Sequence, residues 1–325
     1  MHRIVLAIVI GSGACTAEQP PAGYAPGLGT QANPVPGYDE YALKSRVMTP
    51  LGIDDVTTAI DQLHAFALHG GTTLIAQNEG STALLALNGL PSSLRTKLEG
   101  WIDLELDKQK LGAVTARQAV GDIAGMADTA VNQFTVESAL TITPTGAQHT
   151  LRDLNFSPAN LDIVIPIGGL TSDVIAQKTT ATVGEGGAIE LGDQHFKLGF
   201  GAHAWQAINL ATTTMYGSDL TIIEHLDCNA IAQAVAARCV SGTCVGHATE
   251  LAALCQNGLT ELVDDLRSAL APVALTSLRF AHGTARLVDD NRDGVADQIV
   301  EGHWDAETDI GTGARATQVS FTGAD

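Results

Sequence analysis

Three stretches in the first half of the chain place apolar residues three or four positions apart, which is the spacing of one face of an α-helix. The first runs over Asp54–Leu68, the second begins at Ser92 after Pro91, and the third begins near Thr115. Their apolar stripes are Val56, Ile60, Leu63 and Ala67; Leu94, Leu98, Trp101 and Ile102; and Ala116, Val120, Ile123, Ala127, Val131 and Phe134. Polar residues flank the stripes, so we expect three amphipathic helices.

From Phe134 the period changes to two, which is the spacing of a half-buried strand. Apolar and polar residues alternate up to Ile142, and Pro144-Thr145-Gly146 is typical of a turn. The next predicted strands are Gln148–Phe156, Leu161–Ile167, Asp173–Val183 and Ala188–Leu198, with a hairpin turn at Gly184–Gly187. Consecutive strands joined by short turns predict an antiparallel meander.

Helical spacing returns at Ala202 and lasts until Pro272, after which three closing strands are expected. Those strands are Thr284–Val288, Gln298–Trp304 and Ala316–Thr322. Helices and strands are segregated along the chain, so we predict an α+β fold with N-terminal helices, a central meander, a helical hairpin and C-terminal strands. The predicted regions are a signal peptide (1–14), a tether (15–45), a helical region (46–134), a β region (135–200), a helical region (201–272) and a C-terminal β region (273–325). Residues 46–325 are also compatible with one compact domain.

Four cysteines in the second helical region have the spacing C-x10-C-x4-C-x10-C. Eleven residues make about three helical turns, so Cys228 and Cys239 share one face of a helix, and Cys244 and Cys255 share one face of the next. The short turn between the two helices predicts an antiparallel hairpin with nested disulfides, Cys228 to Cys255 and Cys239 to Cys244. The arrangement resembles the twin CX9C helical hairpins over about thirty residues. Zinc is the alternative, but zinc sites favour closer knuckles such as C-x2-C.

The formal charge of −19 argues against a nucleic-acid partner, because a phosphate backbone would meet a surface of its own sign. It also argues against adsorption to anionic headgroups and makes divalent cations natural counter-ions. Only 4% of the residues are aromatic, so the core should consist mainly of Ala, Leu, Val and Ile.

One loop, Asp289–Asp297, has the pattern of a calcium-binding loop. Side-chain oxygens stand at positions 1, 3, 5 and 9, a glycine at position 6 and a carbonyl at position 7. The five candidate ligands are Asp289, Asn291, Asp293, Val295 and Asp297. The loop resembles those of EF-hands, dockerins and thrombospondin type 3 repeats, and this resemblance implies weak calcium binding because Val300 replaces the acid at position 12. The alternative is a polar hairpin loop in which Asp and Asn side chains form turns with the backbone.

The N-terminus has the features of an export signal. Arg3 precedes the apolar run Ile4–Ile10, which is too short to span a membrane. Small residues then lead to Cys15, and Gly11–Cys15 resembles a bacterial lipobox, although Ser12 stands where a large aliphatic residue is usual. The resemblance implies acylation of Cys15. The alternative is cleavage before Cys15 by an ordinary signal peptidase.

The stretch Thr16–Gly37 contains five of the eleven prolines and no apolar period, so we interpret it as an extended tether. The layout resembles predicted outer-membrane lipoproteins of unknown function. It implies a cell-envelope location, periplasmic or at the surface, with attachment to the outer membrane through Cys15.

The sequence supplies no catalytic residue and no binding motif for an organic cofactor. The G-x-S-x-G, H-E-x-x-H, C-x-x-C and Walker A patterns are absent. Three functions remain open. The first is a lipid-anchored structural or binding protein, with calcium and an unidentified protein partner. The second is a carrier that encloses an apolar ligand between its helices and the strands of Leu161–Val183. The third is a hydrolase with an unrecognised site.

Overall fold

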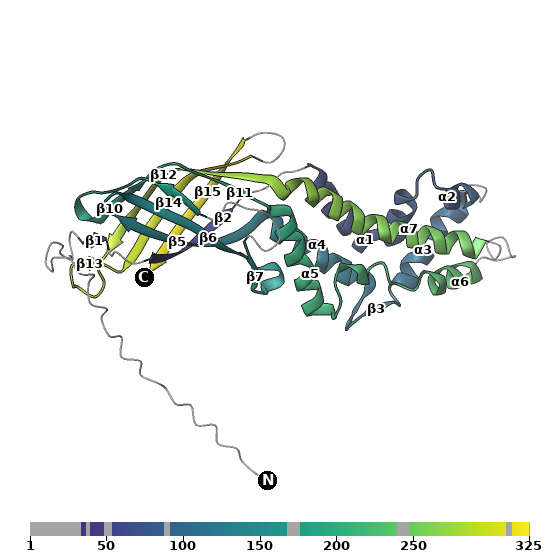
Figure 1. The fold of residues 1–325 in the computed structure, drawn as a ribbon. Helices are drawn as coiled ribbons and strands as arrows, with labels where there is room; N and C mark the ends of the chain where they lie inside the picture. Colours follow the sequence, from purple (N-terminus) through teal and green to yellow (C-terminus); the bar gives the residue numbers. More distant parts are fainter. Residues whose placement is uncertain are drawn as a thin grey trace, which may run out of the picture.

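The molecule is elongated, with a curled antiparallel sheet at one end and a group of helices at the other (Figure 1). The computed structural model describes residues 34–36, 40–48, 54–87, 92–167, 176–238, 247–309 and 314–324. Helices and strands occupy different parts of the molecule, which confirms the predicted α+β class.

The helices of the described residues are α1 (Asp54–Gln77), α2 (Thr82–Leu87), α3 (Ser92–Leu106), α4 (Ala116–Asn132), α5 (Phe200–Tyr216), α6 (Cys228–Arg238) and α7 (Ala248–Leu270). They begin at or near the predicted positions, except α2, which was not predicted; α1 continues nine residues past its predicted end at Leu68. Helix α4 begins at a capping box in which Thr115 and Gln118 each bond the other's backbone N–H. Helix α5 ends at Gly217, whose left-handed backbone (φ 78°) suits a residue without a Cβ.

Most of the strands belong to one sheet, which uses segments from the whole chain. The strands are β1 (Val35–Pro36), β2 (Glu40–Met48), β3 (Lys110–Leu111), β4 (Val114–Thr115), β5 (Gln133–Thr143), β6 (Gly146–Phe156), β7 (Ile163–Pro166), β8 (Ala176–Thr179), β9 (Ala181–Val183), β10 (Ala188–Leu191), β11 (Gln194–Leu198), β12 (Thr276–Val288), β13 (Val295–Ala296), β14 (Gln298–Asp309) and β15 (Ala314–Ala324). The predicted β5–β6 and β9–β10 hairpins are present.

Strand β2 corrects the predicted end of the tether. Residues Glu40–Met48 form a strand inside the sheet, antiparallel to β5 on one side and to β15 on the other. Ala42, for example, is paired with both Ala139 and Ala324. The predicted tether of residues 15–45 therefore overlaps a sheet strand. The strand was not predicted, because its alternation is short and follows directly after a stretch rich in proline and glycine.

The sheet curls until it closes on itself. Strand β8 pairs with β6, and β9, which follows β8 after one residue, pairs with β10. The pairings then continue through β12, β14, β15, β2 and β5 back to β6. We call this closed set of strands the strand ring; β11 extends it by pairing with β12. The predicted central meander and the C-terminal strands are thus parts of one sheet.

The strand ring has an apolar inner face and a polar outer face, as period-two alternation requires. Six of the seven phenylalanines lie in this ring or beside it, and all of them are buried. Phe196, Phe280, Trp304 and Phe321 form a continuous aromatic chain, with neighbouring ring centroids 5.3–5.6 Å apart. The low aromatic content therefore does not mean a purely aliphatic core, because the few aromatic residues are gathered in one place.

Phe200 connects the strand ring to the helices. It begins α5 and packs against Phe134 of β5, with ring centroids 4.8 Å apart, and against Phe156 of β6. The buried apolar residues of the ring and of the helices form one continuous cluster. The two ends of the molecule therefore share a core.

Helix α1 extends beyond its predicted end at Leu68 but is kinked at His69 (φ −142°, ψ 66°). The kink frees two backbone groups, and neighbouring helices supply their partners. Arg117 of α4 donates to the carbonyl of Leu68 at 2.9 Å, and Asp103 of α3 accepts from the N–H of Gly71 at 2.9 Å. Arg117 also lies 3.5 Å from Asp103, so one ion pair joins the two helices that hold the kink.

Helices α6 and α7 form the predicted hairpin, and a disulfide joins Cys228 to Cys255 with their Cα atoms 5.6 Å apart. Both sulfurs are used in this bond, so neither is free for the zinc alternative. The second predicted pair, Cys239 and Cys244, lies outside the described residues.

The buried carboxylate of Glu105 ties α3 to the end of α6. It accepts from Lys108 at 2.8 Å and from Arg238 at 2.5 Å. Burial alone would raise the pKa of Glu105, but its bonds to these two cations lower it below the usual value. The carboxylate therefore stays charged at neutral pH and remains an acceptor for both.

We predict that Gly71→Ala destabilises the protein while Gly100→Ala does not. A Cβ on Gly71 would lie 2.2 Å from the carbonyl oxygen of Glu99, whereas a Cβ on Gly100 would meet no atom within 4 Å. Urea unfolding should show a loss of about 1 to 3 kcal/mol for the first variant. The second should gain up to about 1 kcal/mol from its higher helix propensity. Equal stability of the two variants would contradict the close α1–α3 contact.

Candidate functional site

The predicted calcium loop, Asp289–Asp297, joins β12 to β14 at the end of the strand ring that faces away from the helices (Figure 1). Its strand β13 pairs in parallel with β1, and the N–H of Val35 donates to the carbonyl of Gly294 at 3.1 Å. The buried hydroxyl of Tyr41 in β2 donates to the carbonyl of Ala296 at 2.9 Å. The loop is therefore the place where the first described residues meet the sheet.

Asp289 organises the first half of this loop. Its carboxylate is only 1% exposed and accepts three backbone N–H groups. One oxygen accepts from Arg292 at 2.6 Å and from Asp293 at 3.1 Å, and the other accepts from Gly294 at 2.8 Å. These charge-assisted bonds replace the water that the buried carboxylate has lost.

The other candidate ligands also bond the loop backbone. Asn291 accepts from the N–H of Asp293 at 2.9 Å, and Asp293 accepts from the N–H of Val295 at 2.8 Å. Asp297 reaches back from position 9 to the N–H groups of Asp290 and Asn291, at 3.0 and 3.2 Å. These are the Asx turns of the polar hairpin alternative. Each carboxylate oxygen has two acceptor sites, so the turns do not use all of them.

The structure thus brings Asp289, Asn291, Asp293 and Asp297 into one loop. It does not make them converge, since no group of three His, Cys, Asp or Glu side chains in the described part of the chain could hold a metal ion. Calcium binding by this loop stays a prediction.

The predicted anchor, Cys15, lies outside the described residues, as does all of residues 1–33. Among the helices of the described ranges, none has both the length and the apolar character needed to cross a membrane.

The strands proposed to cover an apolar ligand, Leu161–Val183, are described except for residues 168–175. Strand β7 lies beside β6, while β8 and β9 connect the two sides of the strand ring. No residue of β8 or β9 is buried, and Val183 is 41% exposed. These two strands close the sheet.

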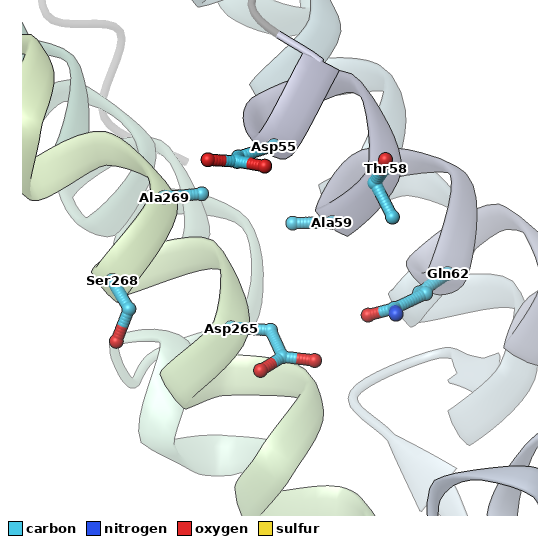
Figure 2. A pocket seen from close by; sticks show the side chains of 7 residues that line it. All are labelled: Asp55, Thr58, Ala59, Gln62, Asp265, Ser268 and Ala269. Atoms are coloured by element: carbon cyan, nitrogen blue, oxygen red, sulfur yellow. The ribbon is translucent and has the colours of Figure 1, made fainter.

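A pocket of about 260 Å³ lies between α1 and α7. It is lined by Asp55, Thr58, Ala59, Gln62, Asp265, Ser268 and Ala269. Figure 2 shows Asp265 and Gln62 extending toward each other from the two helices. Burial raises the pKa of Asp265, and the charge of Asp264 adds to this, while a hydrogen bond from Gln77 opposes it. The pocket carries negative charge and none of the residues singled out from the sequence.

A second polar site lies inside the strand ring and was not predicted. The Ser138 hydroxyl of β5 lies 2.7 Å from Nε2 of His149 in β6, and Nδ1 of His149 lies 2.8 Å from Oε1 of Gln194 in β11. A serine, a histidine and an orienting amide in this order are the groups of nucleophilic catalysis. Ser138 is only 3% exposed and His149 only 1%, so this pair lies inside the strand ring and not at its surface.

Two N–H groups of this interior have no acceptor among the described residues: the amide nitrogen of Gln194 and the indole nitrogen of Trp304. Both residues are at most 1% exposed. A buried donor without a partner costs about 1–3 kcal/mol. At Gln194 and Trp304, the inner face of the ring therefore carries polar groups that reduce the stability of the fold.

Sequence reasoning missed this interior cluster because its members are far apart in the chain. The available signal was weak: polar residues stand at inward positions of otherwise apolar stripes, as with Ser138 in β5 and His149 in β6. Period-two alternation identifies those positions, but the partners become known only when the strands are arranged around the ring.

No family model, curated protein or solved structure matches the chain.

We predict that His149 makes stability depend on pH. Burial lowers the pKa of His149 to about 4 from an ordinary value of 6.5. The unfolded chain then binds more protons than the folded protein between these values, so stability is full above about pH 6.5 and falls as the pH drops to about 4. The expected loss is about 3 kcal/mol.

Urea titrations at pH 7 and pH 4 measure this effect. Between pH 7 and pH 4, the free energy of unfolding of wild type should fall by about 3 kcal/mol more than that of His149→Gln. His64→Gln removes an exposed imidazole from α1 and should behave as wild type. The same pH profile for His149→Gln and wild type would show that His149 titrates normally.

Proposed function

We infer that the chain is an exported, lipid-anchored protein of the bacterial cell envelope with a structural or binding role, stabilised by calcium in the loop Asp289–Asp297. The observation that supports the calcium proposal is the gathering of four aspartates in a nine-residue loop, with side-chain oxygens at positions 1, 3, 5 and 9. A bound cation would stabilise this loop, because the negative charges of its aspartates repel one another.

The place of this loop supports the anchor. Residues Val35–Pro36, which lie near the end of the proline-rich stretch Thr16–Gly37, pair with β13 at the ring end remote from the helices. An acyl chain on Cys15 would thus be connected to the molecule through the ring end. The negative charge of the protein opposes close contact with anionic headgroups, so attachment depends on the acyl chain.

A carrier of an apolar ligand is the second candidate function. The strand ring supports it, because the ring encloses an apolar interior that contains unpaired N–H donors. The ligand would lie inside the ring, not between the sheet and the helices.

We predict that calcium raises the stability of wild type but has less effect on Asp293→Asn. With a Kd of about 10⁻⁴ to 10⁻³ M, 5 mM calcium should add about 1 to 2 kcal/mol. Asp290→Asn is the matched control, because it removes the same charge at loop position 2, which supplies no ligand. Thermal unfolding with and without calcium, and with magnesium for comparison, measures the effect. Equal calcium shifts in both variants would mean nonspecific screening.

We predict that labelled palmitate enters the wild-type protein in a bacterial host but not Cys15→Ser. The reason is that acylation requires the thiol of a lipobox cysteine. Cys239→Ser should keep the label, since it leaves the N-terminal segment unchanged. Label in Cys15→Ser, or none in wild type, would rule out the anchor while leaving the calcium proposal to its own test.

A further inference from the structure

The interior of the strand ring has an excess of hydrogen-bond donors. Both nitrogens of His149 are occupied, one by Ser138 and the other by the amide oxygen of Gln194. The amide nitrogen of Gln194 and Nε1 of Trp304 remain, each without an acceptor in the described ranges. A third unpaired side-chain atom of the ring strands, Oδ1 of Asn155 in β6, is an acceptor, whereas the two groups near His149 are N–H donors and need an acceptor.

The two donors belong to one cluster. Gln194 bonds His149 directly, and the His149 ring is stacked on Trp304, with centroids 6.3 Å apart and planes 7° from parallel. Phe196 meets the same imidazole edge-on at 5.4 Å, and Phe280 follows between Phe196 and Trp304. Both unpaired N–H groups therefore belong to side chains that lie next to the imidazole of His149, and aromatic rings surround this imidazole.

The surroundings favour an uncharged acceptor. His149 is neutral at neutral pH because burial lowers its pKa to about 4. Among the described residues, the buried acidic side chains are Glu105 in the helices and Asp289 in the end loop, and no lysine or arginine is buried. A carboxylate ligand would lose its water without gaining a cation, whereas a carbonyl oxygen would satisfy an N–H at lower cost.

One side of the indole is closed to a ligand. Gly283 of β12 faces Trp304 so closely that a Cβ at this position would lie 2.2 Å from the indole. This close packing excludes a ligand between Gly283 and Trp304, so any contact with Nε1 involves the remaining surroundings of the ring.

We propose that the strand ring binds a small, uncharged molecule with an apolar body and a carbonyl oxygen, which accepts hydrogen bonds from Trp304 and Gln194. This site rests on the carrier function proposed above. It gives the ligand a chemical class and a polar contact.

Acetophenone is a suitable probe, and ethylbenzene is its control of similar size without an acceptor. In ¹⁵N-labelled wild type, acetophenone should shift the indole N–H resonance of Trp304 and leave those of Trp101 and Trp205 in place. Calorimetry should give about five- to tenfold tighter binding of acetophenone than of ethylbenzene. An unmoved Trp304 resonance, or equal binding of both probes, would overturn the site.

Variants test the donors separately. Trp304→Phe keeps an aromatic ring without the N–H, and Gln194→Met keeps the length without the amide; each should lower the preference for acetophenone to about threefold or less. Trp205→Phe, on α5 outside the ring, should keep the full preference. If Trp304→Phe fails to fold, Gln194→Met and the indole N–H resonance of Trp304 in wild type still test the proposed site.

Native mass spectrometry of the purified protein separates this site from the carrier function. A bound apolar molecule together with an unmoved Trp304 resonance would leave the carrier function and remove the site. No bound molecule and no binding of acetophenone would remove both.

Discussion

Strand β2 supplies the backbone hydrogen bonds that hold the two halves of the sheet together. It lies between β5, from the first half of the chain, and β15, from its last described residues. Without β2, each of these strands would have an open edge of unpaired N–H and C=O groups. The inner face of the strand ring, with its aromatic chain and its polar cluster, exists only because these edges are joined.

The periodicity of the sequence predicted the elements that are determined by residues close together in the chain. The stripe of α4, the β5–β6 hairpin and the facing cysteines Cys228 and Cys255 all follow from spacings of a few residues. Strand β2 was missed because its alternation is short and follows directly after the proline-rich stretch. The kink at His69 was missed because its partners, Asp103 and Arg117, come from other helices.

The same distinction applies to the candidate sites. The loop Asp289–Asp297 is continuous in the sequence, so its residues could be named from their spacing, and its Asx turns follow from the residue types. The cluster of Ser138, His149 and Gln194 comes from three strands, and no sequence spacing relates them. Its detection required the closed sheet.

The pairing of β2 with β15 also sets an order of events. Ala42 finds its partner Ala324 only after all the residues between them are available. A polypeptide that emerges N-terminus first, from a ribosome or through a secretion pore, must therefore keep β2 without this neighbour until β15 has emerged. Such distant pairing delays folding and leaves a strand edge exposed in the meantime. The helices, whose contacts are closer in sequence, can assemble before the ring is sealed.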